Sequence, residues 1–247
     1  TADLSGGNKN VTLTFDADEN IIVNAGVTIS AVNANNNDSL SLDLQAGGAV
    51  TINGTIDLSP GGGGNLNVAA TGALTDGNAA LINAPGSSSL SASTITLGDG
   101  AATLNLAQTS VTTGGSVNLT EADGMTLDSI TATTDVVIES GGDLTTTAGE
   151  DIVGANITIR LAADSLLSVD ADTSITATGN TTLIADKMTL ASTGGDLISA
   201  GAAGTLRLQA VENGTAMRVG AAAGADSDAG AGTLALDNVD LAALNDA

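Results

Sequence analysis

Three pairs of aspartates carry the clearest candidate chemistry in this sequence. They are Asp16 and Asp18, Asp170 and Asp172, and Asp226 and Asp228. Residues two apart on a β-strand point to the same side, so each pair could hold Ca²⁺ together with backbone oxygens. On a loop the same side chains would only be solvated. We expect no catalytic residue and no cofactor. If Ca²⁺ binds, these six aspartates are its candidate ligands.

The composition argues against most other site chemistry. The chain has no cysteine and no histidine, and Phe15 is its one aromatic residue. Thiolate metal sites and disulfides are therefore excluded. Sugar-binding clefts are usually lined by aromatic side chains, and this chain has none to offer beyond Phe15. We predict that the protein is not an enzyme. A carbohydrate-active β-helix enzyme is the alternative hypothesis, because acidic side chains could converge across stacked coils.

The charge balance is strongly acidic. The chain carries 28 acidic and five basic residues, which gives a net charge of −23. Such a surface repels nucleic-acid phosphates and anionic membranes, so we expect no nucleic-acid partner. We also expect no membrane insertion, because no apolar run is long enough to cross a bilayer. No signal peptide is visible after Thr1. We interpret the acidity as keeping a large, extended, secreted surface soluble, with divalent-ion binding and adaptation to salty water as the alternatives.

A repeat of apolar-x-apolar triplets between residues 94 and 178 defines the elements that would position these side chains. One series recurs at close to the same interval and comprises Ile95-x-Leu97, Val117-x-Leu119, Val136-x-Ile138 and Ile157-x-Ile159. Apolar residues alternate with Thr, Asn, Ser and Asp, which is the period of a strand with one buried face. Glycine-rich corners follow the strands. A period of about 20 residues with three short strands predicts a β-solenoid.

The same pattern extends less regularly to both ends of the chain. We predict an all-β fold, a single elongated β-helix domain over residues 1–247 with about 20–25 residues per coil. Residues 1–93 would form less regular coils, 94–220 clear repeats, 221–232 a loop, and 233–247 a terminal coil or cap. Residues 33–37 predict a polar corner with stacked asparagines, and 60–64 a loop. Residues 81–90 predict an irregular passage, and 241–244 a short helical turn.

One run of the repeat is similar to a known family. Residues 123–147 have the sequence DGMTLDSITATTDVVIESGGDLTTT. This run resembles the repeat region of filamentous haemagglutinin-like large exoproteins, which are bacterial adhesins exported by two-partner secretion. The resemblance implies a right-handed parallel β-helix, a location outside the cell or on the bacterial cell surface, and an adhesive or stalk role. It brings no catalytic residue with it.

These observations favour a structural or adhesive shaft of a secreted bacterial surface protein. Its outward faces would attach to glycans or proteins on host or neighbouring cells. A self-assembling extracellular filament subunit is a further alternative, because strand edges at the ends of a solenoid allow end-to-end self-association. Thr-x-Thr pairs such as Thr131 and Thr133 would suit ice binding, but threonine is also an ordinary outward strand residue.

Overall fold

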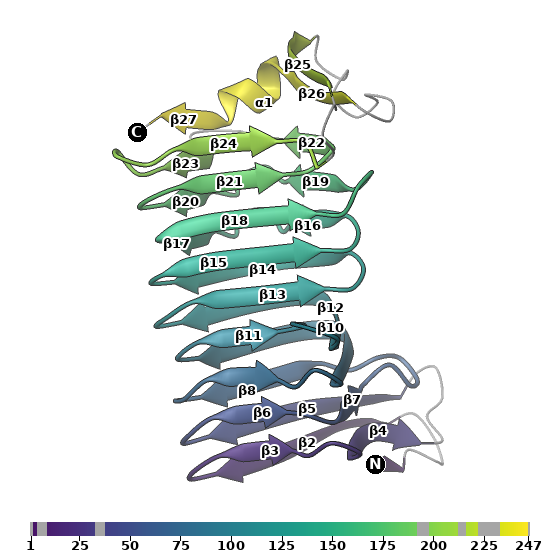
Figure 1. Ribbon diagram of the computed structural model, residues 1–247. Helices are drawn as coiled ribbons and strands as arrows, with labels where there is room; N and C mark the ends of the chain where they lie inside the picture. Colours follow the sequence, from purple (N-terminus) through teal and green to yellow (C-terminus); the bar gives the residue numbers. More distant parts are fainter. Residues whose placement is uncertain are drawn as a thin grey trace. The chain divides into compact units, whose positions relative to one another are not determined.

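Short parallel strands, stacked coil upon coil, make up the protein (Figure 1). The computed structural model describes residues 2–3, 9–32, 38–191, 198–211, 216–221 and 233–246. Within these residues the fold is all-β except for one helix, α1 (Asn238–Ala242). The predicted parallel β-solenoid is therefore confirmed. The chain divides into two compact units, Thr1–Ala122 and Asp123–Ala247.

Alternation of apolar and polar residues explains why these segments form strands. Along Ser39–Ala46 (β5), Leu40, Leu42 and Leu44 are fully buried, and the polar residues between them are partly exposed. Leu42 pairs with Leu66 in the next coil, so aliphatic side chains stack into ladders inside the solenoid. Each Å² of apolar surface that such ladders remove from water stabilises the fold by about 25 cal/mol, and no aromatic residue is needed.

In the first unit, three stacks of strands enclose the core. The first stack contains β2 (Asn10–Ala17), β5, β8 (Leu66–Ala70), β10 (Leu81–Ala92) and β12 (Thr103–Thr113). The second contains β3 (Ile21–Val23), β6 (Val50–Ile52), β9 (Leu74–Asp76), β11 (Ile95–Leu97) and β13 (Val117–Glu121). The third contains β1 (Ala2–Asp3), β4 (Thr28–Val32) and β7 (Thr55–Asp57), and continues into β10 and β12. The two longest strands therefore each serve two stacks.

The second unit repeats this arrangement. Its first stack contains β14 (Met125–Ala132), β16 (Leu144–Thr146), β19 (Leu166–Val169) and β22 (Lys187–Leu190). Its second contains β15 (Asp135–Ser140), β18 (Asn156–Leu161), β21 (Thr181–Ile184) and β24 (Leu206–Gln209). Its third runs from β14 through β17 (Ile152–Gly154), β20 (Ile175–Ala177) and β23 (Ile198–Ala200) to β27 (Leu244–Asp246). A separate pair is formed by β25 (Ala216–Ala221) and β26 (Thr233–Asp237).

Coil length agrees with the sequence prediction except at the start of the chain. In the second stack of the first unit, Ile21 pairs with Val50, which makes the first coil longer than predicted. The later coils of that stack and of its counterpart in the second unit lie within the predicted range. The pairs that show this are Val50–Leu74, Leu74–Ile95, Ile95–Val117, Val136–Ile157, Ile157–Thr181 and Thr181–Leu206.

Two local predictions have different outcomes. The predicted loop at Pro60–Gly64 is confirmed, because no strand lies between β7 and β8 in this described stretch. The irregular passage predicted at 81–90 is instead part of one strand, β10, whose register shifts between Ala84 and Ser87. Pro85 lies at this irregularity, where a missing backbone N–H does not interrupt the ladder.

The C-terminal segment carries the helix α1, which begins before the helical turn predicted at 241–244. The Asp240 carboxylate is buried and accepts a hydrogen bond from the Leu190 backbone N–H at 2.7 Å, which fixes α1 on β22. The predicted corner at 33–37 and residues 222–232 of the predicted loop lie outside the described residues. In the part of the chain that the structure describes, no helix is long and apolar enough to cross a membrane.

Candidate functional site

The outer face of the first stack in the first unit presents an ordered polar surface. Its strands β2, β5, β8, β10 and β12 pair in register, so outward side chains line up in columns across the coils. We call this surface the polar face. Its three columns are Thr12, Ser41, Asn65, Ser87 and Gln108; Thr14, Asp43, Asn67, Ser89 and Ser110; and Asp16, Gln45, Ala69, Ser91 and Thr112.

The polar face is built almost entirely from small uncharged groups. Its columns contain hydroxyls and amides, two carboxylates (Asp16 and Asp43), and no lysine or arginine. Neighbouring strands lie about 4.8 Å apart, and alternate residues along a strand about 6.6 Å apart. Hydroxyl and amide groups both donate and accept hydrogen bonds. The face therefore presents a regular grid of donors and acceptors with little fixed charge.

A shallow hollow interrupts the third column at Ala69. Because the alanine is shorter than the neighbouring Gln45 and Ser91, the surface sinks between them. The hollow has a volume of about 350 Å³, and Asp16 and Thr71 also line it. This volume is at the lower end of the range of small-ligand pockets, about 300–1,000 Å³. Asp16 is thus the only carboxylate in the described lining of the hollow.

Some groups of the polar face already bond to one another. The Gln45 amide donates to the Asp43 carboxylate at 2.8 Å, and the Asn65 side-chain oxygen accepts from the Ser87 backbone N–H at 3.0 Å. These bonds hold the longer side chains in place. Asn67 and Ser89, in the middle column, are exposed to solvent. Polar groups that are already oriented lose less entropy when a partner binds.

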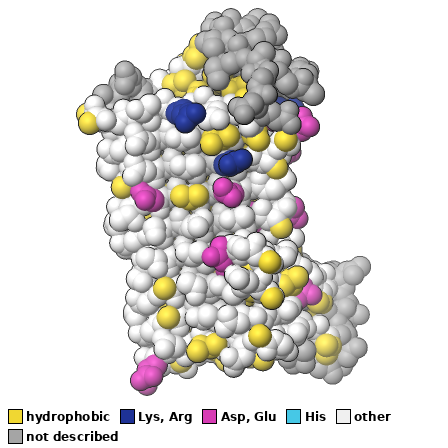
Figure 2. Space-filling view, in the orientation of Figure 1, with side chains coloured by type: hydrophobic (Ala, Val, Ile, Leu, Met, Phe, Trp, Pro, Cys, Tyr) yellow, Lys and Arg dark blue, Asp and Glu magenta, His cyan; other side chains and the backbone are white. Residues whose placement is uncertain are grey.

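A second face of the first unit is also poor in charge. Figure 2 shows the surface over β3, β6, β11 and β13, where hydrophobic and uncharged polar side chains predominate. Thr51, Thr75 and Thr96 form one column there, and the Thr75 hydroxyl lies 3.5 Å from that of Thr51. This column is one residue wide, whereas the columns of the polar face are three abreast.

The calcium candidates are placed differently from the sequence prediction. Asp16 lies on β2, but Asp18 follows the end of that strand. Asp170 and Asp172 lie in the turn after β19, where Asp172 has a positive φ of 63°. Neither pair has both members on one strand. Asp226 and Asp228 lie outside the described residues. Among the described residues, no three His, Cys, Asp or Glu side chains form a group that could hold a metal ion.

Several carboxylates of the second unit have a role that sequence reasoning missed. Asp143 accepts a hydrogen bond from the Leu166 backbone N–H at 2.8 Å. Asp186 is buried and accepts from two coils, from the Asp164 N–H at 3.0 Å and from the Val211 N–H at 2.9 Å. These carboxylates satisfy N–H groups at corners, where the strand ladders end. The signal in the sequence was aspartate recurring at about the coil length.

Asparagine side chains also accept hydrogen bonds from backbone N–H groups at corners. The Asn156 side-chain oxygen accepts from the Asn180 backbone N–H at 2.9 Å, and the Asn180 oxygen accepts from the Thr205 N–H at 2.9 Å. The Asn156 amide also donates to Asp135 at 2.8 Å. Asparagine stacking was predicted at residues 33–37, but the described example lies along the second stack of the second unit.

One carboxylate in the first unit has an altered acidity. The pKa of Asp76 is raised to about 6, chiefly by burial and to a lesser extent by the nearby charge of Asp99, although a hydrogen bond from the Gly98 N–H opposes the rise. That N–H lies 2.7 Å from the carboxylate. The other Asp76 oxygen is buried and has no hydrogen-bond partner within the described residues. Asp76 thus keeps its proton to a higher pH than an ordinary aspartate.

Comparison with known proteins gives no relative for this arrangement. No family model matches the chain, and neither the curated proteins nor the solved structures contain a significant match. The polar face and its hollow are therefore the features from which a function can be argued.

Proposed function

We propose that the chain is a structural and adhesive shaft of a secreted bacterial surface protein, and that its polar face attaches to glycans on host or neighbouring cells. The observation that carries the proposal is the polar face itself, three columns of mainly hydroxyl and amide groups in register over five strands. A glycan chain presents hydroxyl groups at regular intervals, and these can donate to and accept from the same kinds of group.

The charge of the protein favours neutral glycans over anionic ones. With a net charge of −23, the protein repels sulfated or carboxylated sugars, and the polar face has no lysine or arginine to offset this. Without aromatic platforms each contact is weak. Repetition over several coils compensates, because linked weak contacts raise the overall affinity by factors of about 10² to 10⁴. The hollow at Ala69 gives one position at which a sugar ring can settle below the surface.

A shaft role agrees with how the stacked coils are built. Each coil rests on its neighbours through aliphatic ladders and through hydrogen bonds to corner side chains, such as Asp186. Solenoids of this kind present long regular surfaces for binding. Attachment would therefore be a property of the presented face, and the corners would maintain its spacing.

The proposal is tested by binding to a panel of immobilised neutral polysaccharides, including β-glucans, mannans and galactans. We expect the triple variant N67A/S89A/S91A to lose at least tenfold in apparent affinity, because it removes polar groups from the centre of the face and from the wall of the hollow. A matched control is T145A/S168A/T189A, which empties one outward column of the second unit. An equal loss in both variants, or no binding by the unaltered protein, would contradict the proposal.

A further inference from the structure

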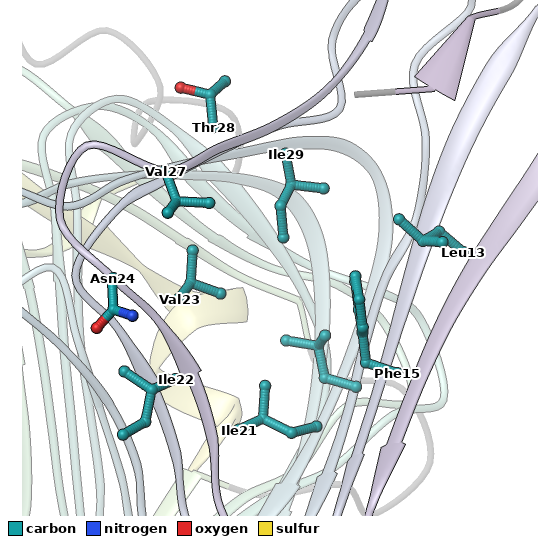
Figure 3. Close-up of a pocket in the computed structure, with 10 residues that line it drawn as sticks. Leu13, Phe15, Ile21, Ile22, Val23, Asn24, Val27, Thr28 and Ile29 are labelled. Atoms are coloured by element: carbon teal, nitrogen blue, oxygen red, sulfur yellow. The ribbon is translucent and has the colours of Figure 1, made fainter.

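The first coil leaves an apolar end that the described residues do not cover. Phe15 is 41% exposed, Ile22 56% and Val27 44%, whereas Leu44, the partner of Phe15 in the next coil, is fully buried. These four side chains line a hollow of about 350 Å³. Figure 3 shows Phe15 and other apolar side chains of this coil around it. An apolar surface of this kind on a solvated protein usually marks a contact site.

The strand at this end also has an unpaired edge. In the described part of the chain, β2 pairs with β5 alone. The backbone carbonyls of Lys9 and Ala17 accept from the N–H groups of Ser39 and Gly47 in the next coil. Odd-numbered residues of β2 thus direct their backbone groups toward β5. Because backbone groups alternate along a strand, the even-numbered Thr12 and Thr14 direct theirs to the open edge.

The sequence of β2 is nearly symmetric about Leu13. Asn10, Val11 and Thr12 precede it, and Thr14, Phe15 and Asp16 follow in mirrored order of side-chain type. We propose that two copies of this chain associate through their first coils, with the two β2 edges paired antiparallel about a two-fold axis at Leu13. The occupant of the apolar end is therefore a second copy of the same end.

This pairing satisfies both the backbone and the side chains. Antiparallel pairing centred on Leu13 sets Thr12 opposite Thr14, and these are the residues whose backbone groups point to the open edge. Such opposed residues exchange both N–H···O bonds. Val11 then lies opposite Phe15, and the two Leu13 side chains meet at the axis. Opposed residues in an antiparallel pair point to the same face, so these apolar side chains would join the cores of the two copies.

The charges at the ends of β2 support the same orientation. Lys9, which precedes the strand, is the one basic residue of the first unit, and Asp16 and Asp18 lie at the other end. Antiparallel pairing brings Lys9 of one copy next to the Asp16 and Asp18 end of the second copy. A parallel arrangement would set like charges side by side. Charge complementarity of this kind fixes orientation more than it adds affinity.

A closed pair fits the described residues better than an open filament. A head-to-tail filament would need a matching open end on the first stack of the second unit. There, α1 lies on β22 through Asp240, and Leu234 and Leu236 of β26 are buried. A self-complementary patch that binds its own copy gives a closed two-fold dimer. This association does not depend on glycan binding by the polar face.

Sedimentation velocity and light scattering over a range of concentrations test the proposal. We expect a reversible monomer–dimer equilibrium. Phe15→Lys should weaken it at least tenfold, because it sets a charge in the joined core. Leu81→Lys is the matched control, since Leu81 is 37% exposed on β10, outside the first coil, and should leave the equilibrium unchanged.

Two further variants test the same association if Phe15→Lys fails to fold. Thr14→Pro removes an N–H that points to the open edge and spares the pairing with β5, so it should also yield monomers. Lys9→Glu should weaken the dimer and should make its dissociation constant less sensitive to salt concentration. Lys187→Glu should change neither. A protein that stays monomeric at every concentration, that forms open-ended polymers, or that loses dimer equally with Leu81→Lys would overturn the proposal.

Discussion

The two units share one architecture but use their polar side chains differently. The first unit holds ten of the 28 acidic residues and one of the five basic ones, and the second holds eighteen and four. In the first unit, hydroxyls and amides cover a sheet face. In the second, Asp186 accepts backbone N–H groups from two coils. Carboxylates also accept backbone N–H groups in the first unit, where Asp76 accepts from Gly98 and Glu121 from Leu106.

The net charge of a unit alone therefore does not identify the surface that binds a partner. A carboxylate that accepts two backbone N–H groups is committed to the fold, because losing it would leave buried donors unsatisfied. A hydroxyl that points from the middle of a sheet is not committed in this way. Both units therefore have carboxylates built into the scaffold, and the polar face of the first unit presents hydroxyl and amide groups with few charges beside them.

The largest effect is expected where the two units are alike, in the close stacking of coils at glycine. A side chain at Gly64 would place its Cβ against the Leu40 carbonyl oxygen, and one at Gly201 would place it against that of Thr178, both well inside van der Waals contact. We expect Gly64→Ala and Gly201→Ala each to lower the free energy of unfolding by about 3 kcal/mol, as overpacking does. Urea unfolding followed by circular dichroism measures this.

A corner glycine at which an added Cβ would meet open space provides the control. Apart from its own chain neighbours, no atom of the described residues lies within 4 Å of the position that a Cβ would take at Gly114, so Gly114→Ala should change stability little. Equal stability of Gly64→Ala and Gly114→Ala would mean that the coils of the first unit do not stack closely at Gly64. Close stacking at glycine would then not be a feature that the two units share.

A smaller effect separates a carboxylate at a corner of the second unit from one on the polar face of the first. Asp186→Ala leaves the N–H groups of Asp164 and Val211 without their acceptor, and should cost about 2 kcal/mol. Asp43→Ala on the polar face removes a carboxylate that accepts, within the described chain, from the side-chain amide of Gln45 and from no backbone N–H, so its cost should be below about 0.5 kcal/mol. The shift of the urea midpoint of each variant measures both.

The distinction between the two carboxylates fails if Asp186→Ala and Asp43→Ala lower the free energy of unfolding equally. Equal costs would mean that the carboxylate on the polar face is as much a part of the scaffold as the one at the corner. Asp186→Asn refines the result, because an asparagine keeps one acceptor oxygen and should recover about half of the loss.

The fold could be predicted from the sequence because its determinants are local and repeated. Triplets such as Val136-x-Ile138 alternate over a strand, and their recurrence at the coil length leaves few architectures open. The strand β10 was missed because Pro85 and Gly86 are ordinary turn residues. Only pairing with both neighbouring coils shows that they sit at a register shift inside a strand.

The candidate site could not be predicted, because it depends on register between coils. Asn67 and Ser89 lie one full coil apart in the sequence, and only strand pairing shows that they share a column. The same limit applies to acidic residues. Asp16 and Asp18 look like a ligand pair in the sequence, but the end of β2 separates them. Asp186 follows Asp164 at about the coil length in the sequence, but only the structure shows that it accepts hydrogen bonds from coils on both sides.

The smallest effect concerns Asp76, a partly buried carboxylate of the first unit. Its pKa rises from 3.8 to about 6 on folding, chiefly through burial. Between these two values the folded protein keeps a proton that the unfolded chain has lost. Stability therefore falls as the pH rises through this window, and the loss is complete above it.

Asp76→Asn should remove this decline and leave the variant more stable than the original protein at pH 7. We expect a gain of about 1 kcal/mol, less than a fully buried carboxylate would give, because Asp76 is only partly buried and water screens its charge. The asparagine oxygen of this variant can still accept from the Gly98 N–H. Urea unfolding between pH 4 and pH 7 measures the slope for both proteins. Asp99→Asn should reduce the slope only in part, since the charge of Asp99 is the lesser cause of the raised pKa. Parallel slopes for Asp76→Asn and the original protein would show that the folded protein does not hold a proton on Asp76 to a raised pH.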